Sequence, residues 1–458
     1  MKNRFAIPAL LMLGLAFLDV WCDLLGHGQA MVPAADTVQK AFMNGRVVWN
    51  AALVVFCGFI VLRPNALARR RSALDGGAAV VAALFTIIYA CAPSWMQDGM
   101  LPIACIAVTG MCYGWLEIRL LCGVAYIADT SLVVMALVLS RVLKSFMVAL
   151  FGTIDDVALI AIDACAALAC GAFLIAAEHA RGTVASTRAP SSWSLPQADR
   201  SFFIMFLVLY PVLNAVSRAL SPLGFWGDTT IVGAEGFMRA LPAAFVFCAV
   251  AMLVFWKPDT QAMFRRMAAA LLILLGMLIM VDGDMFASTG IPQNLLDSAK
   301  LSVELLSHFL FWLAAVMAVR TLNWPMMRSA AMAELVMSFS AIVLSTMLQA
   351  VSGVERVAIT GVLYGIVAGL VVRIWRLREQ TEIQLRNMDE ACEAIACKNG
   401  LTPRETEVLK LLAEGRSRPY IMEKLVVSDA TVKSHTSHIY RKLGVSGKQE
   451  LIALVRGE

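Results

Sequence analysis

The chain has 458 residues, of which 60% are apolar and 16% are charged. Soluble globular domains have about 45–50% apolar and about 25% charged residues, so this composition excludes an ordinary soluble protein, a disordered chain and a secreted disulfide scaffold. The formal net charge of +5 is modest, so the positions of the basic residues are more informative than their number.

Twelve mostly apolar runs are long enough to cross about 30 Å of hydrocarbon. Six of them precede a polar segment at 178–200 and six follow it. The runs are approximately Phe5–Leu25, Val47–Leu62, Gly76–Ala92, Met100–Leu116, Leu120–Ser140, Val157–Ala177, Phe202–Leu220, Glu235–Trp256, Ala268–Phe286, Leu301–Val319, Ala331–Val351 and Val357–Trp375. The sequence therefore predicts a polytopic transmembrane bundle over residues 1–375. Its 6+6 layout is similar to that of transporters of the major facilitator type.

Lysine and arginine residues decide the expected orientation, because cytoplasmic loops are enriched in both. With the N-terminus inside the cell, the inner segments carry roughly threefold more of them than the outer segments. We therefore expect a multi-pass protein of the bacterial inner membrane with both termini in the cytoplasm. Arg141 and Lys144 are the main exceptions, because they fall in an expected outer loop between the fifth and sixth runs.

Ionisable groups inside membrane spans are costly and are therefore candidates for function. We expect a polar cavity that binds a small polar or aromatic ligand. For His308 the alternative is a bundle histidine whose hydrogen bonds are satisfied. The candidate lining is Asp129, Arg218, Glu304, His308 and Trp312.

Enzyme and metal motifs are not found in the sequence. The 11 cysteines are scattered, without a CxxC pair or zinc-type Cys/His spacing. No Walker loop, nucleophile elbow or histidine-kinase block occurs. We expect no enzyme activity, no cofactor and no metal.

After Trp375 the sequence becomes polar. Residues 376–398 predict a charged helical linker. Leu377, Met388, Ala391 and Ile395 lie near one face of it, which predicts a marginal seam between two copies of the chain. The alternative is a plain solvated linker.

Residues 399–458 show dense helix signals. Thr402, Pro403 and Glu405 have the spacing of an N-cap, a first-turn proline and a capping box. Gly415 and Gly444 predict two helix ends. Further helix starts are expected at Ser417 and Ser428, and a short fourth helix is expected from Lys448 to Val455.

Two short helices, a tight turn and a basic third helix indicate a helix-turn-helix. The stretch Leu401–Val455 resembles the LuxR-type DNA-binding domain of bacterial regulators, through its opening LTPRE, the TVKSH of the third helix and the KLGV that follows. The resemblance implies a small four-helix domain that binds double-stranded promoter DNA. Domains of this kind act in pairs on two half-sites, so we expect a homodimer on DNA.

The third predicted helix carries the candidate DNA contacts. Lys433, Ser434 and Ser437 are spaced to reach base edges in the major groove. Thr431, His435 and Arg441 flank them and are better placed for phosphates. The alternative is a solvated basic face on a structural bundle. The complete candidate set is Thr431, Lys433, Ser434, His435, Ser437, Arg441 and Lys442.

The fold class expected from these observations is all-α, with a twelve-span bundle followed by a four-helix DNA-binding domain. The function expected is a membrane-bound one-component transcription regulator that senses a small-molecule effector from within the lipid membrane. The alternatives are a secondary transporter with a regulatory DNA-binding tail and a tethered DNA binder without a ligand. A transporter is disfavoured because the acidic residues do not repeat clearly between the two halves.

Overall fold

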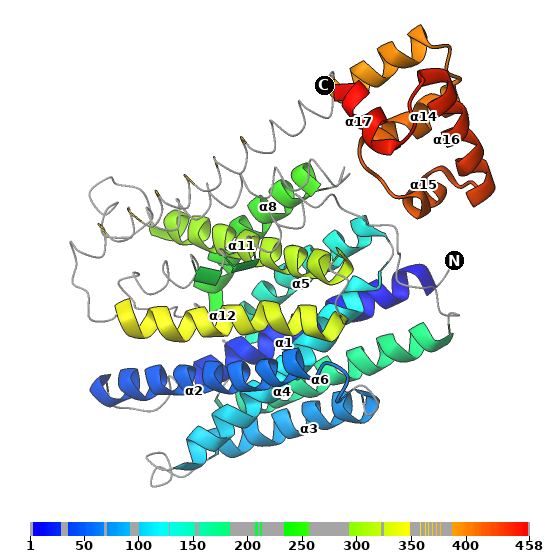
Figure 1. Ribbon diagram of the computed structural model, residues 1–458. Coiled ribbons are helices and arrows are strands. Elements are labelled where there is room, and N and C mark those ends of the chain that lie inside the picture. Colours follow the sequence, from blue (N-terminus) through cyan, green and yellow to red (C-terminus); the bar gives the residue numbers. More distant parts are fainter. Residues whose placement is uncertain are drawn as a thin grey trace. The chain divides into compact units, whose positions relative to one another are not determined.

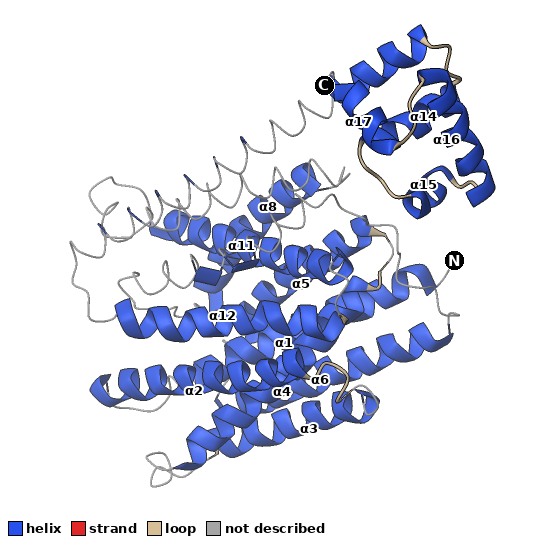
Figure 2. Ribbon diagram, in the orientation of Figure 1, coloured by secondary structure: helices blue, strands red, loops and turns tan. Residues whose placement is uncertain are grey.

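The computed structural model describes residues 3–28, 35–67, 71–91, 100–127, 129–151, 156–183, 233–255, 293–321, 325–348 and 387–456, with a few isolated positions between them. The chain divides into two compact units, Met1–Ala368 and Gly369–Glu458. Every regular element in the described ranges is a helix (Figure 2). The expected all-α fold class is confirmed.

The first unit is a bundle of long helices that lie side by side (Figure 1). Helix α1 packs against α4, α5 and α6, while α2 packs against α4 and α12. Helix α3 covers α4 and α6, and α8 lies between α5 and α11. The helices are α1 (Asn3–Gly28), α2 (Ala35–Leu62), α3 (Arg71–Ala90), α4 (Met100–Ala125), α5 (Thr130–Phe151), α6 (Asp156–Thr183), α8 (Gly233–Phe255), α11 (Gln293–Thr321) and α12 (Met326–Leu348).

Six of these helices are long and apolar enough to cross a membrane, namely α1, α3, α4, α5, α6 and α12. Shorter apolar stretches occupy Val47–Leu62, Ala240–Ala249 and His308–Met317 of α2, α8 and α11. Nine of the twelve expected spans therefore coincide with helices. The expected spans Phe202–Leu220, Ala268–Phe286 and Val357–Trp375 lie wholly or mostly outside the described residues.

The expected boundaries of the fourth and fifth spans are wrong. Helix α4 continues through Arg119 to Ala125, and α5 begins only at Thr130. Arg141 and Lys144 therefore lie inside α5 and not in an outer loop. Ion pairs with another helix stabilise Arg141 and Lys144 within α5, so these charged residues do not mark the end of a helix.

Close helix packing in the bundle depends on small side chains, as is common in membrane proteins. Gly171 of α6 faces Ala79 of α3 so closely that a Cβ atom at Gly171 would collide with the Ala79 side chain. This contact brings the backbones of α3 and α6 together near a cluster of charged groups described below.

The second unit contains a helix at 387–398 followed by α14 (Pro403–Ala413), α15 (Arg418–Leu425), α16 (Asp429–Leu443) and α17 (Lys448–Arg456). One apolar core joins all five helices. Its fully buried members include Cys392, Val408, Leu409, Ile421, Val432, Ile439 and Leu451.

Helix 387–398 is part of this core. Met388, Ala391 and Ile395, which the sequence suggests as a seam between two copies, pack against the core of their own chain. Lys410 Nζ of α14 lies 2.8 Å from Glu393 Oε1 and fixes the helix from its exposed side. The apolar face of this helix is therefore used within the unit, because four short helices leave part of the core uncovered.

Candidate functional site

Helix α14 begins with a complete capping box. Thr402 Oγ1 accepts a hydrogen bond of 3.3 Å from the Glu405 backbone N–H, and the Thr402 backbone N–H donates to Glu405 Oε2 at 2.8 Å. Pro403 occupies the first turn, where no backbone donor is needed. The expected helix start is confirmed.

Glu405 is also the centre of a buried polar cluster. Its Oε2 accepts a hydrogen bond of 2.7 Å from Lys442 Nζ, and that ammonium donates a second one, of 2.9 Å, to the Gly400 carbonyl. The hydrogen bond from Lys442, followed by that from the Thr402 backbone, lowers the pKa of Glu405 to about 2. Lys442, a candidate DNA contact, thus joins α16 to the start of α14.

The starts of α15 and α16 are capped differently. Ser428 Oγ accepts from the Thr431 backbone N–H at 3.2 Å, which confirms the expected start of the third helix. Ser417 is the N-cap of α15, but its side chain makes no capping hydrogen bond. Val426 ends α15 in the left-handed conformation, with φ of 54° and 89% of its surface exposed.

Helix α16 presents one polar face to solvent. Lys433, Ser434, Ser437 and Arg441 are exposed, whereas Val432 and Ile439 of the opposite face are buried. The Thr431 hydroxyl contacts Ser428, and His435 is half-buried. Lys433 pairs at 2.9 Å with Asp429, but both side chains are about half exposed, so its ammonium remains available to a ligand.

His438 is an exposed residue of the same face that sequence reasoning missed. Its side chain is 48% exposed, and its Nδ1 lies 3.7 Å from Glu405 Oε1. The signal available in the sequence was its spacing, because His438 follows Ser434 by one helical turn. The exposed polar face of α16 therefore comprises Lys433, Ser434, Ser437, His438 and Arg441.

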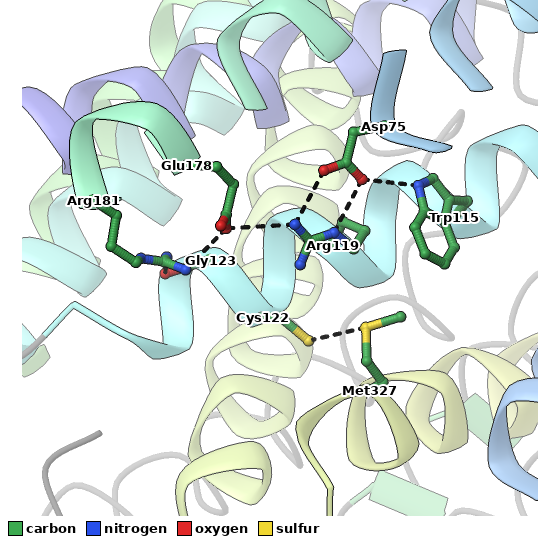
Figure 3. Close-up of polar contacts among 8 residues, drawn as sticks. All are labelled: Asp75, Trp115, Arg119, Cys122, Gly123, Glu178, Arg181 and Met327. Atoms are coloured by element: carbon green, nitrogen blue, oxygen red, sulfur yellow. Dashed lines mark hydrogen bonds and ion pairs between the residues drawn. The ribbon is translucent and has the colours of Figure 1, made fainter. Parts of the chain in front are cut away.

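In the bundle, a second polar cluster joins α3, α4 and α6 (Figure 3). Arg119 donates two hydrogen bonds of 3.0 Å to the carboxylate of Asp75, and the Trp115 indole N–H donates a third of 2.9 Å. Glu178 lies 3.5 Å from Arg119 and 2.9 Å from Arg181. Asp75, Trp115 and Arg119 are buried, so this cluster locks the three helices together.

Two further ion pairs join α1 to α5. Asp19 lies 2.6 Å from Arg141 NH1, and Asp23 lies 2.6 Å from Lys144 Nζ. The Arg141 guanidinium also lies 5.7 Å from the ring centroid of Trp312 in α11. Arg141 and Lys144, which the sequence analysis placed in an outer loop, thus connect α5 to α1, and Arg141 also connects it to α11.

Of the expected ligand-binding residues, the structure describes the side chains of Asp129, His308 and Trp312. Asp129 precedes α5 and accepts a hydrogen bond of 3.0 Å from the Ser131 backbone N–H. Trp312 packs beside Arg141, about three turns further along α5. His308 is half-buried in α11. Arg218 and the side chain of Glu304 lie outside the described residues.

A pair of buried acids also lies in the bundle, and sequence reasoning missed one of them, Glu117. Glu117 of α4 accepts a hydrogen bond of 3.1 Å from the Tyr113 hydroxyl, and Glu334 of α12 accepts one of 2.9 Å from the Ser338 hydroxyl. The sequence signal was the apolar run that precedes Glu117. Within the described ranges, no group of three His, Cys, Asp or Glu residues is arranged to hold a metal ion.

Comparison with known proteins identifies the second unit. Residues 399–455 match the family described as bacterial regulatory proteins, luxR family. The oxygen regulatory protein NreC of Staphylococcus aureus is 48% identical over 52 residues, which cover 11% of this chain and 24% of that protein. An HTH-type transcriptional regulator of Mycobacterium bovis is 42% identical over 52 residues, which cover 11% of this chain and 6% of that protein. The chain thus spans less than a quarter of these relatives.

Solved structures resemble the chain over a greater length. The fucose:proton symporter FucP of Escherichia coli aligns with 82% of this chain and 98% of its own, with 13% identity and a TM-score of 0.44. A second structure, described as the major facilitator superfamily transporter FucP in the outward conformation, gives 13% identity and a TM-score of 0.43 over 81% of this chain and 98% of that one.

Proposed function

We propose that this chain, whose residues 399–455 are a LuxR-type helix-turn-helix domain, is a membrane-bound one-component transcription regulator. Its helical bundle senses a small molecule, and its C-terminal unit binds promoter DNA. One observation carries the proposal: the exposed polar face of α16 occurs in the same chain as six helices that can cross a membrane. A protein with both parts can connect events at the membrane directly to transcription.

The chemistry of α16 supports DNA binding. A lysine and two serines within one turn offer donors and acceptors to base edges in the major groove. Arg441, one turn beyond Ser437, is placed for a phosphate oxygen. A single module of this size makes few contacts, so tight binding needs two copies on two half-sites, and we propose a homodimer on DNA.

The orientation follows from the same proposal. Promoter DNA is cytoplasmic, so the C-terminal unit must be inside the cell. The excess of lysine and arginine in the expected inner segments supports the same arrangement in the inner membrane. A cytoplasm-specific reporter inserted within 178–200 should therefore be active, and the same reporter within 221–233 should be silent.

The decisive experiment selects DNA from a random library with the full-length protein in lipid nanodiscs. A common sequence should be enriched, and it should confer regulation on a promoter reporter in cells. The variant Lys433→Ala/Ser434→Ala/Ser437→Ala should enrich nothing. Lys398→Ala, an exposed change on helix 387–398, serves as the control and should select the wild-type sequence. No enrichment by the wild-type protein would refute the proposal.

The second candidate is a secondary transporter with a regulatory tail. The observation that favours it is the buried acids Glu117 and Glu334, because such groups form proton relays in transporters. Proteoliposome uptake driven by a proton gradient would support this candidate, and binding of a ligand without its movement across the bilayer would support a sensor.

A further inference from the structure

Glu117 of α4 and Glu334 of α12 are neighbouring buried acids that have no basic partner among the described residues. Their exposed fractions are 2% and 8%, and their carboxyl groups are within hydrogen-bond reach of each other. Asp19, Asp23 and Asp75 each form an ion pair with an arginine or a lysine. In the described part of the bundle, no lysine or arginine forms such a pair with Glu117 or Glu334.

One oxygen of this pair needs a donor. Glu117 Oε1 accepts from the Tyr113 hydroxyl and Glu334 Oε1 accepts from the Ser338 hydroxyl. Glu117 Oε2 is buried, and no donor in the described residues reaches it. A second carboxylate is itself an acceptor when it is ionised, and it supplies that donor only when it is protonated. An unpartnered buried carboxylate oxygen is costly, so the site requires either a proton or a cationic group.

Three aromatic rings form a cluster that includes Tyr113, whose hydroxyl contacts Glu117. The ring centroid of Tyr113 lies 6.2 Å from that of Trp21 and 5.5 Å from that of Trp49, and the two indoles are 6.2 Å apart. The Trp21 indole N–H donates to the Thr86 hydroxyl at 3.0 Å, which fixes this ring. Trp49 and Tyr113 are only partly buried. Aromatic faces attract cations within about 6 Å of the ring centroid, so these rings suit a positive charge.

The remaining groups near the pair do not supply a positive charge. Asp19 of α1 interacts electrostatically with both Glu117 and Tyr113, but it already forms an ion pair with Arg141. Cys57 of α2 also lies close to both acids. The described surroundings are therefore acidic or neutral, so the site is satisfied either by a proton on one of the acids or by a positive charge on a bound molecule.

An organic cation fits this setting better than a metal ion. Calcium requires about six to eight oxygen ligands, whereas this site offers two carboxyl groups and three aromatic rings. We propose that the cluster of Trp21, Trp49, Tyr113, Glu117 and Glu334, here named the cage, binds the ammonium group of a small organic amine. The inference rests on the proposed sensing function and names the chemical class of the effector.

The position of the cage links amine binding to the shape of the bundle. Helices α1, α2 and α4 precede the polar segment at 178–200, whereas α12 belongs to the second half of the chain. An ammonium ion between Glu117 and Glu334 holds the two halves together by charge. Without the amine, the acids repel each other or share a proton. A ligand that binds one arrangement more tightly than the other shifts the balance between them.

The test measures binding to the full-length protein in nanodiscs at neutral pH, with three probes of similar size. They are 2-phenylethylamine as the cation, 2-phenylethanol as the neutral analogue and phenylacetate as the anion. The amine should bind saturably and quench tryptophan fluorescence, and the two other probes should not. Glu117→Gln and Glu334→Gln, which keep the side-chain shape, should each weaken amine binding at least about tenfold. Trp49→Leu should weaken it through loss of a ring.

Asp163→Asn is the matched control, because Asp163 of α6 is also a buried carboxyl with an unpartnered oxygen but is not part of the cage. This variant should bind the amine like the wild type. Equal binding of the neutral probe, or unchanged amine binding in Glu117→Gln, would overturn the proposal. So would the absence of amine binding by wild-type protein, which would leave the acids as a proton site only. Selection of DNA by the same sample is an independent readout, so failure of the cage is distinguishable from failure of the proposed regulator.

Discussion

Ion pairs of nearly the same length have opposite roles in the bundle and in the DNA-binding unit. Arg119 Nε lies 3.0 Å from Asp75, with side chains 5% and 1% exposed. Lys433 Nζ lies 2.9 Å from Asp429, with side chains 59% and 45% exposed. Breaking a buried pair leaves an uncompensated charge, whereas an exposed pair contributes only about 0–1 kcal/mol. Burial and not distance therefore separates charges that hold the fold from charges that are available to DNA.

The largest expected effect tests the buried side of this comparison. Arg119→Met should destabilise the full-length protein by about 3–5 kcal/mol, because it leaves the Asp75 carboxylate buried and unpaired. Thermal unfolding in detergent measures the loss. Arg119→Met combined with Asp75→Asn should recover part of it, because no unpaired charge remains. If Arg119→Met unfolds at the wild-type temperature, the cluster in Figure 3 does not stabilise the bundle.

The next largest effect concerns Glu405, which is a buried carboxylate in the second unit. Its pKa is lowered to about 2 by Lys442 and Thr402, against about 4.3 in an unfolded chain. Its stabilisation is therefore complete above about pH 4.3 and is lost as the pH falls towards 2. Urea unfolding of fragment 387–458 should show a loss of about 3 kcal/mol over this window.

Glu405→Gln is the companion variant. It should lose most of that pH dependence and should already be less stable at neutral pH, because it lacks the ion pair with Lys442. Glu407→Gln changes a neighbouring exposed acid and should behave like the wild type. An unchanged acid response in Glu405→Gln would assign the response to other groups.

A smaller effect is expected for the exposed basic residues of α16. Lys433→Ala should weaken binding to the selected DNA sequence by about 1–3 kcal/mol, with little effect on scrambled DNA. Arg441→Ala should weaken binding to both sequences and should reduce the salt dependence, because phosphate contacts release counterions. Mobility shifts at several salt concentrations distinguish the two. Equal losses on both sequences for Lys433→Ala would place Lys433 among the phosphate contacts.

The smallest effect is a gain in stability at Val426. A β-branched residue is strained in the left-handed region, and the exposed Val426 side chain gains little from packing. Val426→Asn should therefore stabilise fragment 387–458 by about 1 kcal/mol. Val427 packs against the core, so Val427→Asn should have the opposite sign. A lower melting temperature for Val426→Asn would show that the valine has a contact that outweighs its strain.

The two units also differ in how far the sequence predicts them. The caps at Thr402, Ser428 and Gly444 were predictable because each depends on residues within one turn. The Asp75–Arg119 and Asp19–Arg141 pairs were not, because their partners are far apart in the sequence. The expected boundary between the fourth and fifth spans, at 117–119, is wrong for the same reason. Arg119 lies inside α4 because Asp75, which is distant in the sequence, stabilises its charge there.

Within the DNA-binding face, spacing predicted the exposed stripe of α16 but not which of its charges are already bound. Lys442 has the charge of a DNA contact, yet its ammonium lies on Glu405 from the other end of the domain. His438 was missed although it follows Ser434 by one helical turn, because its contact with Glu405 joins residues far apart in the sequence. Both distinctions depend on tertiary contacts that a single sequence does not show.

Helix 387–398 has a consequence for how the second unit can be joined to other proteins. The family match begins at residue 399, but Cys392 and Ala396 are buried in the same core as the matched helices. A chimera joined at 399 would lose that cover and expose apolar surface, whereas one joined before 387 would carry the whole core with it. The unit that can be exchanged between proteins is therefore longer than the segment that matches the family, and it includes helix 387–398.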